Sequence, residues 1–116
     1  MKPIQLITET RDFYAADPSL RAKSNTFCFY LDITTGNSCA VGRCMNPGPW
    51  QEFIGDFDEV QKNFSLGKVF RPEYQNIPSD LWTSLQDWHD NDRNFTDTGL
   101  TAKGEVLINN LISLYK

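Results

Sequence analysis

The chain has 116 residues, 40% of them hydrophobic and 13% aromatic, and a net charge of −4. This length predicts one globular domain over residues 1–116, because so short a chain buries a single core. The longest uninterrupted apolar run, residues 27–31, is too short for a membrane helix, which takes about 20 residues. The small negative charge, spread over both halves of the chain, excludes a basic surface for a nucleic-acid duplex.

The cysteine content indicates a reducing compartment. Cys28, Cys39 and Cys44 are an odd number, whereas small secreted domains usually carry a larger, even set joined as disulfides. Residues 1–6 lack the apolar run of a signal peptide. We therefore expect reduced thiols and a cytoplasmic location.

The N-terminal third predicts a helix, a strand and a turn. Residues 4–16 repeat apolar side chains with helical spacing, and the Asp-Pro pair at 17–18 ends the helix, because a residue before proline avoids the α region. After a polar connection, residues 27–33 form the one clear strand, since they are aromatic and nearly all apolar. Gly36 and Asn37 then supply a turn, because both residue types tolerate positive φ.

The middle of the chain predicts short helices and an ordered loop. A helix over residues 38–45 begins with a serine cap and is stopped by the Asn-Pro-Gly-Pro that follows. Residues 50–64 carry apolar side chains that fit one or two short helices broken near Gly55. Residues 65–78 are interpreted as an ordered loop, with a strand at 68–70.

The C-terminal third predicts two helices. Ser79 is placed to cap a helix over residues 80–90, and a polar loop leads to a helix over residues 101–115. The inner face of that last helix is expected to consist of Leu107, Ile108, Leu111, Ile112, Leu114 and Tyr115. The fold class is therefore α+β, mostly α, with one aromatic strand or short hairpin packed against about four helices. The main core is expected to contain Phe27, Phe29, Leu31, Leu81, Leu85, Leu107 and Leu111.

Cysteine and histidine are scarce in this sequence, and together they are the nucleophile and the base that a thiol hydrolase needs. Cys39 lies in the first turn of the helix expected at 38–45, where the amide groups and the helix dipole lower the pKa of a thiol. His89 is the single histidine, and Asp90 follows it. Neighbouring residues on a helix point about 100° apart, so Asp90 is not expected to orient His89. We favour the alternative that Cys39 is a small buried hydrophobe and that His89 is a helix-end residue bonded to backbone.

No metal and no cofactor is expected. A zinc site would need Cys28, Cys39, Cys44 and His89 together, and only Cys39 and Cys44 approach the usual ligand spacing. Five residues apart on a helix, these two side chains diverge. The isolated glycines assemble neither a phosphate loop nor a dinucleotide-binding fingerprint.

Three residues are candidates for binding. Arg43 lies near the N-terminus of the helix expected at 38–45, where free amide groups attract anions. Trp50 follows a Pro-Gly-Pro run and Trp88 lies at a helix end. Both tryptophans are expected to be partly exposed, where they could line a pocket or a partner surface.

Four short motifs occur in a fixed order: Cys28-Phe-Tyr30, Gly36-Asn, Cys39-Ala-Val-Gly-Arg-Cys-Met45 and Leu85-Gln-Asp-Trp-His89-Asp90. Together they resemble a family of small tailed-bacteriophage proteins with a Cys-Ala-Val-Gly helix and a Leu-Gln-x-x-His-Asp helix. The resemblance covers roughly residues 27–90. It implies an accessory protein made in the cytoplasm of an infected bacterial host, and it implies no activity.

Two classes of function follow. The first is a non-catalytic protein that binds and modulates or inhibits a host or anti-phage defence component, either a protein effector or a nucleotide signal. The second is a small thiol hydrolase that uses Cys39 and His89. The small size, the lack of a cofactor motif and the single histidine favour the first class.

Overall fold

The computed structural model describes residues 1–22, 30–32, 35–52 and 57–116, and these are mostly helical. Within these ranges, no helix combines the length and the apolarity that crossing a membrane requires.

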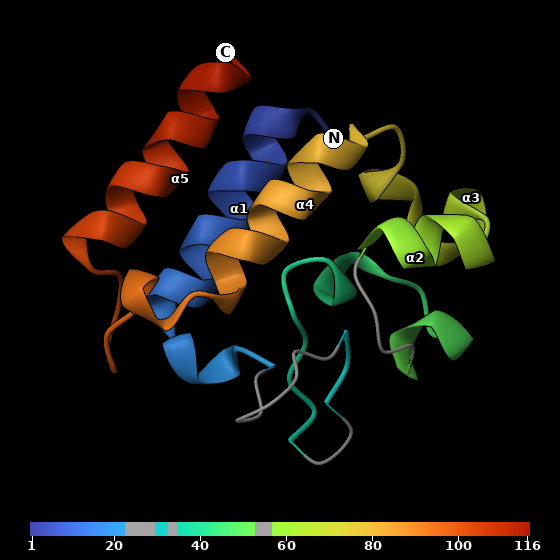
Figure 1. Cartoon of the computed structure of the whole chain (residues 1–116), viewed down its shortest axis with the longest axis horizontal. Coiled ribbons are helices and arrows are strands. Elements are labelled where there is room, and N and C mark those ends of the chain that lie inside the picture. Colours follow the sequence, from blue (N-terminus) through green and yellow to red (C-terminus); the bar gives the residue numbers. More distant parts are fainter. Residues whose placement is uncertain (23–29, 33–34, 53–56) are drawn as a thin grey trace.

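Three helices that are distant in sequence pack against one another (Figure 1). They are α1 (Pro3–Ala16), α4 (Ser79–Asp90) and α5 (Ala102–Leu114). The shorter helices α2 (Phe57–Asn63) and α3 (Leu66–Val69) lie together on the other side of the molecule. Single turns of 3-10 helix occur in the connections: η1 (Pro18–Leu20), η2 (Gly42–Cys44), η3 (Pro49–Glu52), η4 (Pro72–Tyr74) and η5 (Asp92–Asn94).

Helix α1 forms where the sequence predicted a helix over residues 4–16. Leu6, Ile7 and Tyr14 are buried along one face, and the helix ends at Ala16, before the Asp-Pro pair. Phe13, expected on the same apolar stripe, is exposed. Its ring instead lies edge-on to the ring of Tyr14, with 4.9 Å between the ring centroids.

Helices α4 and α5 confirm the predicted ranges to within one residue. Thr101 caps α5 by accepting the amide of Gly104 at 3.1 Å, as helix-capping threonines do. The cap predicted for α4 is wrong, because Pro78 occupies the cap position and the Ser79 hydroxyl accepts a hydrogen bond from Gln61 at 2.7 Å.

The inner face predicted for α5 is only partly correct. Ile108 is fully buried and Leu111, Ile112 and Tyr115 are half-buried, but Leu107 and Leu114 are exposed. Helix α5 lies at the edge of the three-helix group and contacts α1 and α4, so part of its apolar circumference is left uncovered.

The helix predicted at 38–45 is wrong, and only the turn η2 forms there. Its start is prevented by backbone pairing: Ser38 bridges to Leu31 and Arg21, and the amide of Cys39 donates to the carbonyl of Tyr30. At the other end, Met45 pairs with Phe70. The strand predicted at 68–70 is also wrong, because α3 occupies those positions and Phe70 alone makes a bridge.

The predicted strand lies mostly outside the described residues, since 27–29 and 33 are not among them. In the described part, Leu31 and Ser38 form an antiparallel bridge, and Gly36 adopts a positive φ of 77° in the turn between them, as predicted. Pairing within the described ranges consists of isolated bridges. The described residues therefore form a mostly helical fold, and they do not show the strand packed against helices that the α+β prediction contains.

The region predicted as one or two short helices at 50–64 contains η3 and α2, and residues 53–56 between them lie outside the described part. Phe57 of α2 joins an aromatic cluster in the core. There the rings of Phe70 and Trp82 are stacked, with 4.4 Å between centroids and 4° between planes.

The predicted core is confirmed at α4 and corrected elsewhere. Leu81 and Leu85 are fully buried, Leu111 and Leu31 are half-buried, and Leu107 is exposed. Phe27 and Phe29 lie outside the described residues. The buried residues absent from that core set come mainly from α1, from the turn around η2 and from the segment between Phe57 and Tyr74.

Candidate functional site

Cys39 and His89 lie in the interior, with 1% and 0% of their surface exposed. The sulfur of Cys39 accepts the amide of Gly42 at 3.2 Å. Tyr14 connects the two regions, because its hydroxyl donates to the carbonyl of Ser38 at 2.6 Å and its ring lies edge-on to the His89 ring, with 4.9 Å between centroids. Cys39 and His89 are therefore both buried near Tyr14, whereas Asp90, the third candidate catalytic residue, is half-buried.

Asp90 does contact His89, contrary to expectation. The Nδ1 atom of His89 lies 2.7 Å from Oδ1 of Asp90, the last residue of α4. Gln86, four residues earlier, donates to the same carboxylate oxygen at 2.7 Å, and its own oxygen accepts the amide of Val41 at 3.4 Å. The i,i+4 contact of Gln86 thus holds the carboxylate of Asp90 in place, and its bond to Val41 joins two of the four motifs of the phage resemblance.

Arg21 also contacts this region, and no pattern in the sequence predicted that it would. Its Nε donates to the carbonyl of His89 at 2.8 Å, its Nη2 lies 3.1 Å from the carboxylate of Asp92, and its guanidinium lies over the Phe95 ring at 4.2 Å. Arg21 therefore satisfies a carbonyl at the C-terminal end of α4, where a cation is also favoured by the helix dipole. Arg21 and His89 are 68 residues apart in the chain, so no local sequence pattern could predict their contact.

Arg43, a candidate for binding, is held against α1. Its Nη1 pairs with the carboxylate of Glu9 at 2.6 Å, its Nη2 donates to the Thr10 hydroxyl at 3.1 Å, and the Tyr74 hydroxyl donates to Glu9 at 2.6 Å. The Arg43 side chain is mostly buried in this arrangement. These contacts fasten the turn η2 to α1, and we assign Arg43 a structural role.

This cluster has perturbed pKa values. Burial raises the pKa of Glu9, but the hydrogen bonds from Tyr74 and Arg43, together with the charge of Arg43, outweigh burial and leave the pKa below its ordinary value. Burial raises the pKa of the neighbouring Cys44 thiol to about 12. Glu9 is therefore charged, and Cys44 protonated, at neutral pH.

Glu9 is expected to make the protein less stable in acid. The ordinary pKa of glutamate is 4.5, and the folded value is lower, so the stabilisation is complete above pH 4.5 and is lost as the pH falls through the folded pKa. Glu9→Gln should show a smaller decrease in the free energy of unfolding between neutral pH and about pH 3. Urea denaturation at several pH values measures this. Glu73→Gln, at an exposed position, is the control and should follow the wild type.

The two candidate tryptophans differ in exposure. Trp50 is half-buried, as predicted, and its indole nitrogen donates to the carbonyl of Asn46 at 2.7 Å. Trp88 is buried, so its predicted partial exposure is wrong. Its indole nitrogen donates to the carbonyl of Gly104 at 3.1 Å, because α5 begins directly over the end of α4.

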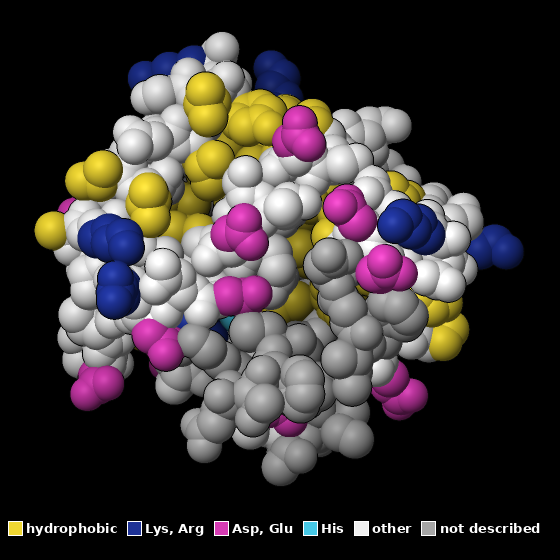
Figure 2. Space-filling model, viewed as in Figure 1, with side chains coloured by type: hydrophobic (Ala, Val, Ile, Leu, Met, Phe, Trp, Pro, Cys, Tyr) yellow, Lys and Arg dark blue, Asp and Glu magenta, His cyan; other side chains and the backbone are white. Residues whose placement is uncertain are grey.

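A groove lies between α4 and α5, with a volume of about 350 Å³. Figure 2 shows hydrophobic side chains gathered on this part of the surface. Two groove-lining leucines of α5 are exposed, Leu107 by 38% and Leu114 by 76%. The lining residues of this α4–α5 groove are Ser84, Asp87, Trp88, Asn91, Asn94, Leu107, Asn110, Leu111 and Leu114.

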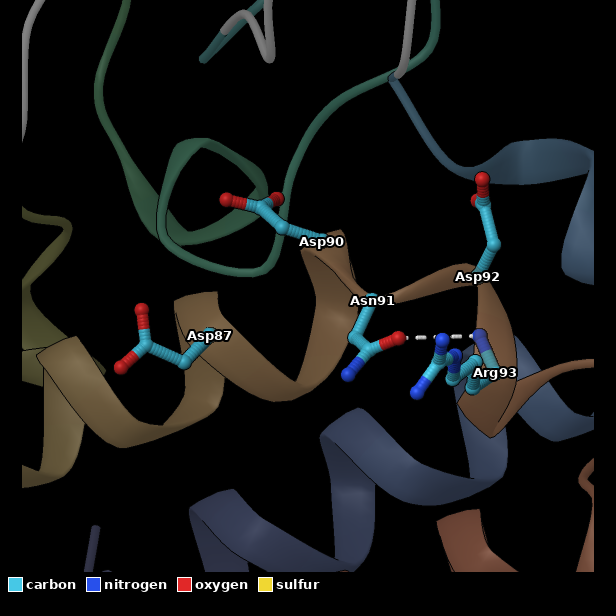
Figure 3. Close-up of a pocket in the computed structure, with 5 residues that line it drawn as sticks. All are labelled: Asp87, Asp90, Asn91, Asp92 and Arg93. Carbon is cyan, nitrogen blue, oxygen red and sulfur yellow. Dashed lines mark hydrogen bonds between the residues drawn. The ribbon is translucent and has the colours of Figure 1, made fainter.

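A second, more open hollow of about 490 Å³ adjoins the groove at the end of α4 (Figure 3). This acidic pocket is lined by Asp87, Asp90, Asn91, Asp92 and Arg93, and it shares Asp87 and Asn91 with the groove. The amide of Arg93 donates to the side chain of Asn91 at 3.0 Å. Asn91 thus fixes the start of the loop that follows α4.

The apolar pattern of α5 is the sequence signal for the groove, although it also fits a helix buried in the core. Apolar residues occupy positions 106, 107, 108, 111, 112 and 114 of α5, which is wider than the single stripe of a helix with one buried face. Such a surplus indicates either a helix that is covered on several sides or a second apolar face that is available to a partner.

Metal binding finds no support in the described part of the chain, where no three His, Cys, Asp or Glu side chains are arranged to hold an ion. Cys28, one member of the zinc set considered from the sequence, lies outside those residues. Cys39 and Cys44 are buried, and neither is in a disulfide.

No protein-family model, curated protein or solved structure matches the chain. The resemblance to small tailed-bacteriophage proteins therefore stays a prediction. The candidate site rests on the geometry of the α4–α5 groove and the acidic pocket.

Proposed function

We propose that the protein is a non-catalytic phage accessory protein that docks a host or anti-phage defence protein in the α4–α5 groove. One observation carries this proposal: Leu107, Leu111 and Leu114 lie on one face of α5 and line a concave surface, and two of them are exposed. Single exposed hydrophobic residues are ordinary, but a cluster in a groove is typical of a binding site.

The chemistry of the groove favours a protein over a nucleotide signal as its occupant. Nucleotide phosphates are bound by lysine, arginine or free backbone amides. None of the described residues that line the groove is a lysine or an arginine. The groove opens onto the acidic pocket, where the carboxylates of Asp87, Asp90 and Asp92 outnumber the single guanidinium of Arg93. A phosphate would be repelled there, whereas an apolar segment of a protein would bury the leucines.

The thiol hydrolase remains the alternative, because the contact between His89 and Asp90 resembles the base and its orienting acid in such enzymes. The burial of Cys39 and His89 argues against it, since a nucleophile must reach its substrate.

Thiol alkylation separates these two functions. Cys39 and Cys44 are expected to react with iodoacetamide at least about a hundredfold more slowly in the folded protein than in denaturant, because alkylation requires local opening. Mass spectrometry of proteolytic peptides measures each cysteine and keeps Cys28 separate. Faster alkylation of Cys39 in the native protein than in the denatured one would favour the hydrolase.

A matched pair of α5 variants tests the docking function. Leu114→Asp places a charge in the groove, whereas Val106→Asp places it at a residue of the same helix that is 56% exposed and does not line the groove. A protein captured from infected cells by the tagged wild type is purified and titrated against both variants. Leu114→Asp should weaken binding about tenfold or more, and Val106→Asp should not. Equal affinity for all three proteins would exclude the groove.

A further inference from the structure

Asp87 lies where the α4–α5 groove meets the acidic pocket, and it lines both. It makes no hydrogen bond or ion pair with any described residue. Partial burial raises its pKa, and the nearby charge of Asp90 raises it further. Asp87 is exposed, and a cation beside it would favour the charged form of its carboxylate.

The described part of the chain supplies no cation to Asp87. The sequence has no lysine or arginine between Arg71 and Arg93. Arg93 lines the acidic pocket, but its guanidinium pairs with none of the described carboxylates. Arg21 is already engaged by Asp92. Figure 2 accordingly shows acidic side chains along α4 beside the hydrophobic patch.

Asn94 supplies a second, independent acceptor in the groove. The residue is almost fully buried, and its Nδ2 donates to the carbonyl of Trp88 at 2.8 Å, which fixes the orientation of the amide. Its Oδ1 has no donor among the described residues, although it belongs to a residue that lines the groove. A buried acceptor without a donor is costly, so an N–H group of a ligand would gain from binding here. Less than 1 Å² of Oδ1 is exposed, so the N–H group reaches this atom only after the side chains that cover it move aside.

The wall beside these acceptors is apolar. Leu107, Leu111 and Leu114 recur every three or four residues along α5 and face the groove. The groove thus combines an apolar wall with a charged acceptor and a buried neutral acceptor. An arginine or lysine next to apolar residues matches this combination, because its aliphatic stem packs on hydrophobic surface while its head donates several hydrogen bonds.

We propose that the α4–α5 groove selects a segment of a partner protein in which apolar side chains adjoin an arginine or lysine, with the cationic group bound at Asp87 and Asn94. This inference rests on the proposed function, because it specifies the partner of the same groove. The apolar side chains of the segment pack on Leu107, Leu111 and Leu114. The cation offsets the charge of Asp87, and one of its N–H groups donates to Oδ1 of Asn94 once the side chains that cover this oxygen have moved aside.

Selection from a random peptide library tests the proposal, with the full chain as bait and sixteen-residue peptides displayed on yeast. The enriched sequences should combine apolar residues with arginine or lysine. A synthetic peptide of the enriched sequence is then titrated by fluorescence anisotropy. Asp87→Asn should weaken its binding about fivefold, as expected for a partly exposed charge pair, and should reduce the dependence of binding on salt. Asp58→Asn, at an exposed acid on α2, is the control and should bind like the wild type.

Three kinds of result would overturn the proposal, each in a different way. Enriched peptides without a basic residue, or an unchanged affinity in Asp87→Asn, would refute the cation while leaving the docking function, provided that Leu114→Asp abolishes binding. Peptides that bind Leu114→Asp as well as the wild type, or no enrichment at all, would refute both. A dimer in sedimentation velocity that Leu114→Asp dissociates would identify a second copy of the chain as the occupant.

Discussion

Replacing Leu85 by alanine is expected to lower the free energy of unfolding by about 2–5 kcal/mol, the usual range for truncating a leucine in a packed interior. Leu85 is fully buried in α4, the helix that contacts both α1 and α5. The loss combines the burial energy of the methine and two methyl groups that are removed with the cost of the cavity that they leave. Urea denaturation followed by far-UV circular dichroism measures it.

Leu114→Ala is the matched control, because it removes the same atoms from a side chain that is 76% exposed on α5. Both residue types are good helix formers, so the intrinsic helix term nearly cancels. The control should change the free energy of unfolding by less than about 0.5 kcal/mol. An equally small loss in Leu85→Ala would mean that α4 does not pack on the face that the structure shows.

The helices that the sequence predicted well are those with long periodic patterns and clear ends. Helix α1 repeats apolar residues over four turns and ends at an Asp-Pro pair, and α5 begins at a threonine that does cap it. These signals are local, so they do not depend on the rest of the fold. The burial of His89 was also predictable, since it lies on the same face of α4 as Trp82 and Leu85.

The segment at 38–45 could not be predicted in this way, because its backbone is paired with distant residues. Its helix-like composition suggests a cap and one or two turns. In the fold, the amide of Cys39 donates to Tyr30 and the amide of Asn46 donates to Val69, so the segment is bonded to other parts of the chain at both ends and keeps helical bonds only in the turn between them. Tertiary pairing here overrides local preference.

The groove was missed for a related reason. Leu107 and Leu114 have the spacing of buried helix residues, and the sequence does not show how many elements pack on α5. Only the arrangement of α1 and α4 around α5 leaves that face open. Hydrophobic periodicity identifies an apolar face, but it does not distinguish a face covered by the same chain from one covered by a partner.

Replacing Gly42 by alanine is expected to lower the free energy of unfolding by about 3 kcal/mol, the upper end of the usual cost of overpacking. Gly42 begins η2, and a Cβ atom there would collide with the carbonyl oxygen of Tyr30 and lie 2.7 Å from its Cα. A backbone carbonyl cannot rotate away as a flexible side chain does. The segment around Tyr30 would therefore have to separate from η2.

Gly67→Ala is the control, because the nearest atom to its added Cβ is the Ser65 hydroxyl oxygen at 3.9 Å. Alanine in α3 should leave stability unchanged or raise it by about 0.5 kcal/mol. Thermal and urea denaturation of both variants make the comparison. The result at Gly42 also bears on function, since its amide donates to the sulfur of Cys39. Wild-type stability in Gly42→Ala would mean that the turn is more open than the structure shows, which would weaken the case for a buried Cys39 and strengthen the thiol hydrolase.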